Sequence, residues 1–261
     1  MSGDGETKVS YTDNKQKRAC VLGYPVDLVT KEEALDFAEN FMATGKGLHV
    51  VTINPEIILA AEKNPELDAI IKKAGLIIPD STGMELALRR QGFNIKKLAG
   101  IEFSETLIDR CAKNNYKVAF LGATQKVIEL LQKELKLKYP EINIVYARNG
   151  YFSDNDMPEI TDKLKELNPH LLLVALGAPR QEYIISKYRE ELPHTVMIGV
   201  GGSFDVWAKK VKRAPVFFRI FGLEWLYRLI KQPSRFSRMF PALPLFIFRA
   251  AILGQKSRRE Y

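Results

Sequence analysis

The sequence has few of the residues that build disulfide frameworks and zinc sites. It contains two cysteines, Cys20 and Cys111, and three histidines in 261 residues, and the cysteines do not form a C-x-x-C motif. Both kinds of site need more of these side chains at closer spacing. We therefore predict reduced thiols in a cytoplasmic protein, with no zinc site and no cofactor.

Long hydrophobic runs are also missing. No stretch of about eighteen uninterrupted apolar residues occurs, so a membrane-spanning helix is not expected. Residues 1–18 are polar and lack the apolar segment of a secretory signal, and we expect a disordered tail there. The two Leu-Gly-Ala turns do not extend to G-x-G-x-x-G, which argues against a dinucleotide-binding fingerprint.

Acidic residues are scarce in the last part of the chain. Residues 209–261 hold thirteen Lys or Arg and two acids, a net charge of +11, whereas the whole chain carries +8 and the remainder −3. A basic end on a mildly acidic body indicates an anionic partner, which could be nucleic acid, a phosphorylated substrate or an anionic membrane surface.

Apolar runs alternate with helical patterns through residues 19–215. Short, mostly apolar runs predict strands at 49–53, 76–79, 117–121, 171–176 and 195–200, with a strand and turn in 21–28. Helical spacing follows or precedes most of these runs, for example at 125–138 and 180–188. Continuous apolar strands that alternate with helices are typical of a parallel sheet covered on both faces. We predict a Rossmann-like α/β domain with a mainly parallel sheet.

The composition changes after Pro215. Residues 216–261 are dense in Phe, Leu, Ile, Trp and Tyr, and Glu224, Arg228 and Lys231 share one helical face. Because apolar positions cover much of the helix circumference and basic residues favour anionic lipid, we predict a C-terminal helical appendage that associates with a membrane surface. An ordinary core helix with a solvated basic face is the alternative.

Asp80 directly follows the predicted strand at 76–79. A carboxylate placed where a strand leads into a helix lies at the carboxyl edge of the sheet, where open α/β folds bind ligands. Two interpretations stay open from this stretch alone. Asp80 could act chemically, or it could cap the helix that begins near Met84, as Asp, Ser and Thr commonly do.

Three further loops follow predicted strands and should reach the same edge: residues 52–54, 177–182 and 201–205. Their glycines let a ligand approach the backbone closely, and helix N-termini offer free N–H groups to phosphate oxygens. Arg180 and Arg213 add guanidinium groups whose shape suits a diphosphate. Together these loops predict a binding site for an anionic ligand.

Each polar residue of these loops also has a structural explanation. Asn54 and Asp205 could be helix caps, and Gln181 with Glu182 could form a solvated first turn of a helix. The sequence Asp154-Asn155-Asp156 matches the D-x-D pattern that many sugar-nucleotide enzymes use to hold a divalent ion. It is also a good turn and cap for a helix at 159–167, and we favour that interpretation and predict no bound metal.

Five motifs stand in a fixed order along the chain: Thr52-x-Asn54, Ile78-Pro79-Asp80-x-x-Gly83, Leu176-Gly177-Ala178-Pro179-Arg180-Gln181-Glu182, Gly201-Gly202-x-Phe204-Asp205 and Lys212-Arg213-Ala214-Pro215. Each motif alone is weak, but in this register the chain resembles the WecG/TagA/CpsF family of bacterial glycosyltransferases (glycosyltransferase family 26). The resemblance extends from about residue 21 to residue 238.

The resemblance implies a metal-independent, inverting transfer. The sugar would pass from a UDP-sugar, such as UDP-N-acetylmannosamine or its uronic acid, to an undecaprenyl-diphosphate-linked sugar during synthesis of cell-surface polysaccharide or teichoic acid. By position, Asp80 would be the general base, and Thr52, Asn54 and Gln181 would line the sugar and acceptor pocket. Arg228, Arg235 and Arg238 match the basic positions of the family's appendage, which would close over the site at the membrane and hold the diphosphate.

We therefore expect Asp80 to be catalytic in a domain of residues 19–215, between a tail at 1–18 and an appendage at 216–261. The expected partners are a UDP-sugar donor, a polyprenyl-diphosphate-linked acceptor and the cytoplasmic face of the cell membrane, to which the protein would bind peripherally. The oligomeric state stays open, a homo-oligomer included. The candidate substrate-binding residues are Thr52, Asn54, Gly122, Ala123, Arg180, Gln181, Gly202, Phe204, Asp205, Arg213, Arg228, Arg235 and Arg238.

Two rival functions are a nucleic-acid-binding protein with a basic tail and a nucleotide-binding scaffold without turnover. The tail argues against nucleic acid, because its aromatic and aliphatic residues form long apolar runs instead of isolated stacking residues between basic ones. A transfer or hydrolysis assay with UDP-sugars would separate the scaffold from an enzyme.

Overall fold

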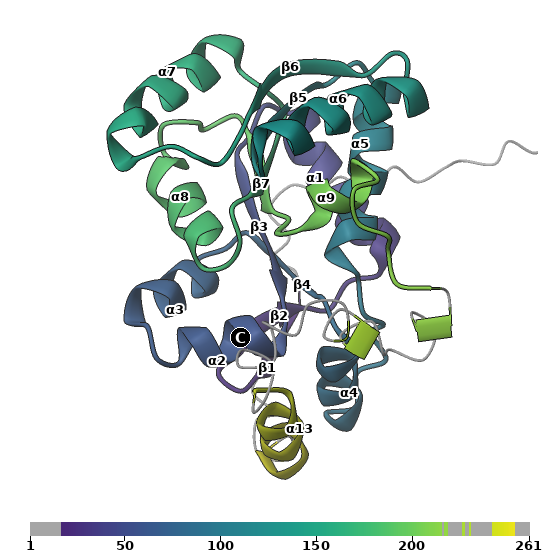
Figure 1. The fold of residues 1–261 in the computed structure, drawn as a ribbon. Coiled ribbons are helices and arrows are strands. Elements are labelled where there is room, and N and C mark those ends of the chain that lie inside the picture. The colour runs from purple at the N-terminus through teal and green to yellow at the C-terminus, as the bar shows by residue number, and fades with distance from the viewer. Residues whose placement is uncertain (1–16, 216, 219–225, 228–229, 231–241, 254–261) are drawn as a thin grey trace, which may run out of the picture.

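The structure is a computed structural model of the chain, and it describes residues 17–215, 217–218, 226–227, 230 and 242–253. Figure 1 shows a twisted sheet with helices packed on both sides. In chain order the elements are β1 (Arg18–Val21), β2 (Tyr24–Asp27), α1 (Lys31–Ala43), β3 (Leu48–Ile53), α2 (Pro55–Ala61), α3 (Pro65–Lys72), β4 (Leu76–Pro79), α4 (Thr82–Arg90), α5 (Gly100–Lys113), β5 (Lys117–Gly122), α6 (Gln125–Lys138), β6 (Asn143–Arg148), the 3-10 turn η1 (Asp154–Asp156), α7 (Met157–Leu167), β7 (Leu171–Ala175), α8 (Arg180–Tyr188), β8 (Val196–Gly199), α9 (Ser203–Trp207) and α13 (Ala242–Leu253).

Six strands form the main sheet in the order β4-β3-β8-β7-β5-β6, and every neighbouring pair is parallel. The central strands β7 and β8 are buried along their whole length, as expected where helices cover both faces. The predicted Rossmann-like α/β class is therefore confirmed.

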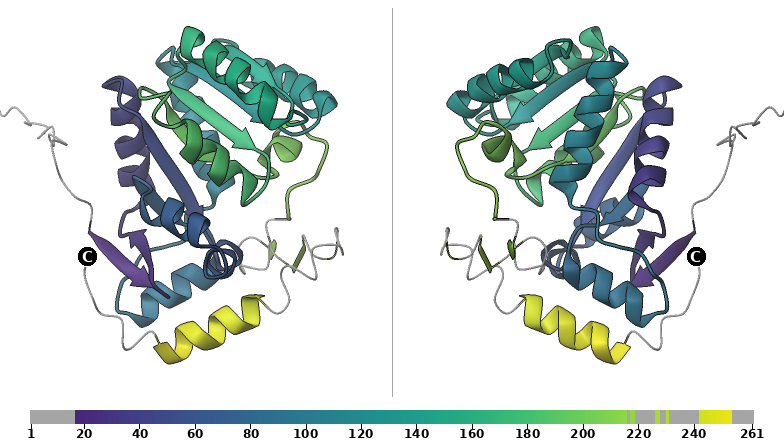
Figure 2. Two further views of the ribbon diagram at one scale, coloured as in Figure 1. Left: turned by 90° about the vertical axis from the view of Figure 1, so that its left-hand side faces the viewer. Right: turned by 90° about the vertical axis from the view of Figure 1, so that its right-hand side faces the viewer.

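The two faces of the sheet carry different helices. α1, α5, α6 and α9 pack on one face, and α2, α3, α7 and α8 pack on the other (Figures 1 and 2). Successive strand residues alternate between the faces, so Val50 joins the core under α1 and α5, and Val51 joins the core under α2 and α3. The helix that follows β3, α2, therefore lies on one face, and the helix that follows β8, α9, lies on the other.

The antiparallel hairpin of β1 and β2 covers the outer edge of β4. Asp27 is fully buried, and its Oδ2 accepts a hydrogen bond of 2.6 Å from the backbone N–H of Ile77 in β4. The other carboxylate oxygen lies 2.7 Å from Nε of Arg18, whose Nη2 also donates to the carbonyl oxygens of Ala74 and Gly75. Side chains of the hairpin therefore satisfy polar groups that an uncovered edge strand would leave open.

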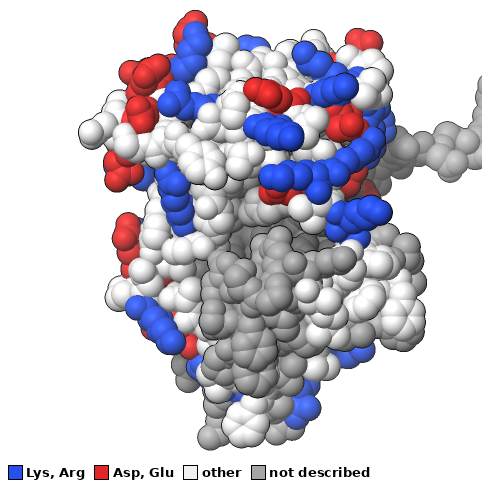
Figure 3. All heavy atoms as spheres, in the orientation of Figure 1, with Lys and Arg blue, Asp and Glu red and all other residues white. Residues whose placement is uncertain are grey.

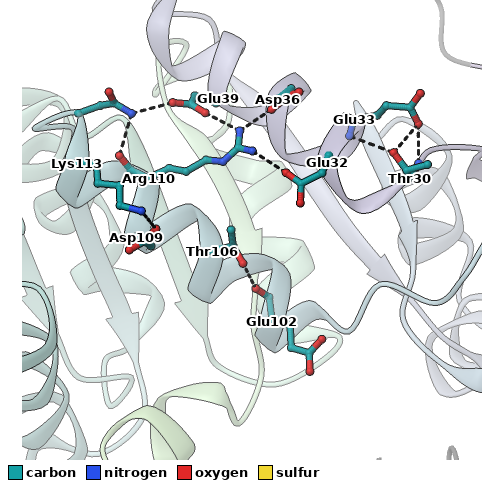
Figure 4. A network of polar contacts seen from close by, with 11 residues as sticks. Thr30, Glu32, Glu33, Asp36, Glu39, Glu102, Thr106, Asp109, Arg110 and Lys113 are labelled. Atoms are coloured by element: carbon teal, nitrogen blue, oxygen red, sulfur yellow. Dashed lines mark hydrogen bonds and ion pairs between the residues drawn. The ribbon is translucent and has the colours of Figure 1, made fainter. Parts of the chain in front are cut away.

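A cluster of ionic side chains joins α1 to α5, on the face of the sheet that these two helices cover. The Arg110 guanidinium donates to carboxylates of Glu32 at 3.1 Å, Asp36 at 2.7 Å and Glu39 at 2.6 Å (Figure 4). Because most of these carboxylates are substantially exposed, the cluster supplies orientation between the two helices more than large stabilisation.

Most of the predicted C-terminal appendage lies outside the described residues, but α13 is described. Phe246 and Ala250 are buried in the core formed with α2 and α4, and Arg249 pairs with Glu62 at 2.6 Å. Leu245 and Phe248 face outward and are 45% and 63% exposed. One side of α13 thus belongs to the core and another side carries exposed apolar residues. Figure 2 shows the helix itself at the bottom of the molecule.

Candidate active site

The carboxyl ends of the parallel strands bring the predicted loops to one edge of the sheet. The segments after β4, β3, β8, β7 and β5 all leave from this edge, because each adjacent pair of strands runs in the same direction. The prediction that the loops converge on one side is confirmed. The exact contacts of each candidate residue then distinguish those that could meet a ligand from those that support the loops.

Asp80 stands at the end of β4 and is partly exposed. Its backbone N–H donates to the carbonyl oxygen of Ile53, and its Oδ1 accepts a hydrogen bond of 3.1 Å from the backbone N–H of Gly100, the first residue of α5. The cap of α4 is Ser81, whose Oγ accepts from Met84 N–H at 3.1 Å. The alternative that Asp80 caps the helix after it is therefore wrong.

The N-terminus of α5 gives this carboxylate a favourable electrostatic environment. The helix dipole places partial positive charge at its first turn, where an anion is stabilised. α5 has no cap from its own neighbouring side chain, since its N-cap residue is Ala99. Asp80, distant in sequence, supplies an oxygen to this turn, and the same contact fixes the direction of its carboxylate.

Thr52 lies beside this contact. A Cβ added at Gly100 would be 2.9 Å from Thr52 Cγ2 and 3.3 Å from its Oγ1, so the glycine is needed for this close approach. Thr52 is partly exposed near the end of β3 and pairs in register with Ile78 of β4. The structure thus brings together Thr52 and Asp80, two of the predicted site residues, at the first turn of α5.

Asn54 is the N-cap of α2, and its Oδ1 accepts from the backbone N–H of Ile57 at 3.0 Å. The structural explanation offered for this residue is confirmed. The cap uses the amide oxygen of Asn54. The amide nitrogen is a hydrogen-bond donor and takes no part in the cap.

Gln181 and Glu182 are buried, with 4% and 3% of their surface exposed. The interpretation of these residues as a solvated first turn is therefore wrong. Gln181 Oε1 accepts from the backbone N–H of Gly201 at 3.0 Å, and its Nε2 donates to Glu182 Oε1 at 2.8 Å. Burial raises the pKa of the Glu182 carboxyl above its usual range, and hydrogen bonds from Gln181 and from its own backbone N–H oppose this rise.

The loop after β8 leads directly into α9. Gly201 has a positive φ of 51°, and Gly202 is the N-cap of the helix, so Asp205 lies inside the first turn and is not the cap. Asp205 Oδ1 is 3.6 Å from Lys210 Nζ. Phe204 is fully buried, with its ring 5.6 Å from that of Phe120, which accounts for its presence as a core residue under the loop.

Arg180, at the start of α8, is exposed but engaged with the neighbouring loop. Its two terminal nitrogens donate to the carbonyl oxygens of Gly150 at 3.3 Å and Phe152 at 3.0 Å, and its guanidinium lies 5.0 Å above the Phe152 ring. The described contacts of Arg180 therefore hold the loop after β6. Gly122 and Ala123 form the adjoining turn, with φ of 136° and 56°. A Cβ on Gly122 would lie 2.3 Å from the carbonyl oxygen of Ala175.

Arg213, like Asp80, contacts the first turn of α5. Its Nη2 donates to Glu102 Oε1 at 2.6 Å, and Glu102 lies in the first turn of α5. This arrangement places a guanidinium at the helix end whose first N–H binds the Asp80 carboxylate. The other predicted arginines, Arg228, Arg235 and Arg238, lie outside the described residues.

The Asp154-Asn155-Asp156 stretch is the turn η1 before α7. Asp156 accepts hydrogen bonds from the backbone N–H of Ser153 at 2.7 Å and from its hydroxyl at 2.8 Å, which confirms the predicted turn. Asp156 is the N-cap residue of α7, but its side chain makes no cap hydrogen bond to that helix. In the described ranges no group of three or more His, Cys, Asp and Glu side chains is arranged to hold a metal ion. Each helix of those ranges is too short or too polar to cross a bilayer.

Two structural features of the candidate site have no signal in the sequence motifs. The role of Gly100 as the donor to Asp80 depends on the return of α5 to the end of β4, twenty positions later in the chain. The burial of Glu182 depends on the packing of α8 against β3 and β8. A glycine that opens a helix without a side-chain cap was the one available hint of the first contact.

Comparison with known proteins gives one consistent result. The model of the glycosyl transferase WecG/TagA/CpsF family matches residues 19–260. An N-acetylglucosaminyldiphosphoundecaprenol N-acetyl-beta-D-mannosaminyltransferase of Bacillus spizizenii is 38% identical over 208 residues, which cover 79% of this chain and 80% of that protein. A Staphylococcus aureus protein of the same name is 32% identical over 246 residues, covering 92% of this chain and 94% of that protein.

The matched region includes the sheet, the Asp80 loop, the Gln181 loop and α13. The resemblance seen in the motifs is thereby confirmed, and the alternatives of a nucleic-acid-binding module and a scaffold without turnover give way to an enzyme. The chain belongs to the WecG/TagA/CpsF family of glycosyltransferases.

Proposed function

We propose that this enzyme transfers an N-acetylmannosamine-like sugar, or its uronic acid, from a UDP-sugar to an undecaprenyl-diphosphate-linked sugar, in the synthesis of a cell-surface polysaccharide or teichoic acid. The names of the Bacillus and Staphylococcus relatives support the transferred sugar and the lipid-linked acceptor. The UDP leaving group and the cell-surface product are the further parts of the proposal.

The observation that carries the proposal is the Asp80 carboxylate, held by a backbone N–H at the open edge of the sheet. In an inverting displacement, Asp80 takes the proton of the acceptor hydroxyl while that oxygen bonds to the anomeric carbon of the donor. The bond from the anomeric carbon to the diphosphate oxygen breaks, and UDP leaves with the electron pair. A positioned base of this kind contributes about 10²–10⁴-fold to the rate.

This assignment sets the direction of the two substrates. With the acceptor hydroxyl on Asp80 after β4, the donor extends across the edge towards the loops after β8, β7 and β5. Among the glycines there, Gly202 has no atom within 4 Å of the position of an added Cβ, which leaves its backbone open to a nucleotide diphosphate. Thr52 and Asn54 lie between the two substrates, at the end of β3.

Stabilisation of the departing diphosphate is the larger electrostatic task. The Arg213 guanidinium contacts Glu102 in the first turn of α5, and we assign Arg213 this role together with Arg228, Arg235 and Arg238. Arg180 is better placed to keep the loop at 150–152 rigid beside the nucleotide, since its terminal nitrogens already donate to that loop. The proposed reaction needs no metal.

We also propose that the enzyme works at the cytoplasmic face of the membrane, where its lipid-linked acceptor is. On the face in Figure 3, Lys and Arg are mixed with Asp and Glu over the body, and the chain's excess positive charge resides in residues 209–261. The exposed Leu245 and Phe248 of α13, with Leu86 of the adjacent α4, offer apolar side chains to the interface. Replacing Leu245 and Phe248 with Gln should reduce binding to anionic vesicles while activity on a short-chain acceptor persists.

The decisive experiment is a donor screen with a synthetic polyprenyl-diphosphate N-acetylglucosamine acceptor. UDP release and the anomeric configuration of the product are measured with and without EDTA. We expect UDP-N-acetylmannosamine to be used, with inversion and without sensitivity to the chelator. No transfer from any UDP-sugar would reject the donor, and loss of turnover in EDTA would reassign Asp154 and Asp156 as metal ligands.

A further inference from the structure

The side-chain amide of Gln181 is held on two sides. Its oxygen receives the Gly201 N–H at 3.0 Å, and its nitrogen gives a proton to Glu182 Oε1 at 2.8 Å. Gly199 provides the space, because a Cβ at that position would lie 2.4 Å from Gln181 Nε2. The amide therefore sits in a slot between the end of β8 and the first turn of α8.

The two contacts allow one orientation of the amide. A backbone N–H can donate and cannot accept, so the atom that faces Gly201 must be the oxygen. The nitrogen then faces Glu182 and needs an acceptor there. Glu182 supplies one whether its carboxyl is ionised or protonated, since both forms keep an acceptor oxygen.

Burial makes Glu182 an unusual choice for this task. With 3% exposure, its carboxyl is nearly removed from water, and its second oxygen has no hydrogen-bond partner in the described protein. Buried carboxyl groups in such surroundings are costly and are retained where they do specific work. Here the identifiable work is to fix Gln181, and through it the turn that leads from β8 into α9.

We propose that Glu182 is a positioning residue that holds the Gln181 amide and, through it, the Gly201-Gly202 turn in the shape that receives the sugar nucleotide donor. This inference rests on the proposed function for the identity of that ligand. The Gln181 amide has a second N–H proton beyond the one donated to Glu182. Because the amide orientation is fixed, this proton keeps one direction. Asp80, at the other end of the site, belongs to the acceptor, so the effect of Glu182 falls on the donor.

The test compares two replacements of Glu182. Glu182→Gln keeps an acceptor oxygen of the same size, whereas Glu182→Met keeps the volume and removes the acceptor. We expect Glu182→Met to raise KM for the donor about tenfold, the size of one lost hydrogen bond, with kcat and the acceptor KM changed less than about threefold. Glu182→Gln should restore the wild-type KM. Glu190→Met, at an exposed position just after α8, is the matched control and should change neither constant.

A second readout does not depend on activity. In protein labelled with 15N-glycine, the Gly201 amide should exchange with solvent about tenfold faster in Glu182→Met than in the wild type, and at the wild-type rate in Glu182→Gln. Absence of transfer by the wild type would reject the proposed function, whereas an unchanged Gly201 exchange rate in Glu182→Met would reject the positioning role by itself.

A double-mutant cycle tests whether Glu182 acts through Gln181. In a Gln181→Ala background, Glu182→Met should have no further effect on the donor KM. If the two effects multiply, or if Glu182→Gln is as impaired as Glu182→Met, the inference is overturned. Should Glu182→Met not fold, Gly199→Ala displaces the same amide without touching Glu182, and it must reproduce both the raised KM and the faster exchange.

Discussion

Two acidic side chains at the same edge of the sheet are held in opposite ways. Asp80 follows β4, is partly exposed and accepts a backbone N–H from the start of α5. Glu182 lies in the first turn of α8, is almost fully buried and accepts from the amide of Gln181. The same functional group is thus partly exposed in one place and enclosed in the other.

In the proposed mechanism, environment and not residue type divides the roles of these two side chains. A carboxylate that must take a proton from a substrate needs access and a fixed direction, and Asp80 has both. A carboxyl group that positions a neighbour needs a constant partner and exclusion of water, which Glu182 has. Asp27 extends the comparison, because it is fully buried but bonded to Arg18 and to the backbone of Ile77.

The largest expected effect is on Asp80. Asp80→Asn keeps the size of the side chain and an oxygen that can accept the Gly100 N–H, but it removes the proton acceptor. We expect kcat to fall about 10²–10⁴-fold. The urea midpoint should stay close to that of the wild type, because the contact with α5 persists.

Asp162→Asn, at an exposed position of α7, is the control for loss of an acidic charge. Transfer and unfolding should both match the wild type in that variant. Full transfer rates in Asp80→Asn would contradict the assignment of the base and would remove the functional side of the comparison.

The position of Asp80 could be predicted because its signals are local. A short apolar run that ends in proline and acid marks the end of a buried strand, and parallel topology then fixes the edge. The cap of α1 is equally local, since Thr30 and Glu33, three positions apart, form a capping box. Helices α6 and α8 have the predicted bounds for the same reason.

The burial of Glu182 could not be predicted, because it depends on contacts that are distant in sequence. A polar pair after proline at a helix start looks solvated, but α8 packs against β3 and β8, and Gly199 and Gly201 contact Gln181. Two elements were missed for related reasons. α5 begins without a side-chain cap, and all six residues of β6 are partly exposed at the sheet edge, which weakens the apolar pattern.

Asp27 should give the largest loss of stability. Asp27→Ala removes the partner of Arg18 and leaves the Ile77 N–H without its acceptor inside the protein. Breaking a buried pair costs about 3–5 kcal/mol, and we expect about 3 kcal/mol because Arg18 is 24% exposed. Urea unfolding measures this change, and a loss below about 1 kcal/mol would mean that the hairpin is not anchored to β4 as described.

The pH dependence of the free energy of unfolding tests the effect of burial on another titratable side chain, His49. Burial, with the charge of Arg189 adding to it, lowers the pKa of His49 from 6.5 to about 3. Below pH 6.5 the unfolded chain therefore binds a proton that the folded chain does not, and stability should fall by about 1.4 kcal/mol per pH unit towards pH 3. His49→Leu should flatten this part of the urea-derived profile, and an unchanged slope would contradict it.

The contribution of Glu182 to the pH dependence of stability has the opposite sign to that of His49. Because burial raises its pKa above 4.5, the folded state keeps a proton that the unfolded chain loses, and the Glu182 contribution to stability falls as pH rises above 4.5. Glu182→Gln should remove this decline and leave the His49 slope in place. A variant with the wild-type profile above pH 4.5 would show that the enclosed carboxyl is not the source.

The smallest effect is expected where carboxylates are exposed and numerous. Arg110→Ala removes the cation shared by Glu32, Asp36 and Glu39, but each exposed pair contributes about 0.2–1 kcal/mol. We expect a total loss of about 1 kcal/mol that shrinks in high salt, because solvent ions screen these charges.

Lys113→Ala, whose pair with Asp109 lies within one helix, is the control and should lose less than about 0.5 kcal/mol. A salt-independent loss of several kcal/mol in Arg110→Ala would place this cluster with Asp27, as an anchor between distant elements, and the division between exposed and enclosed carboxylates would have to be redrawn.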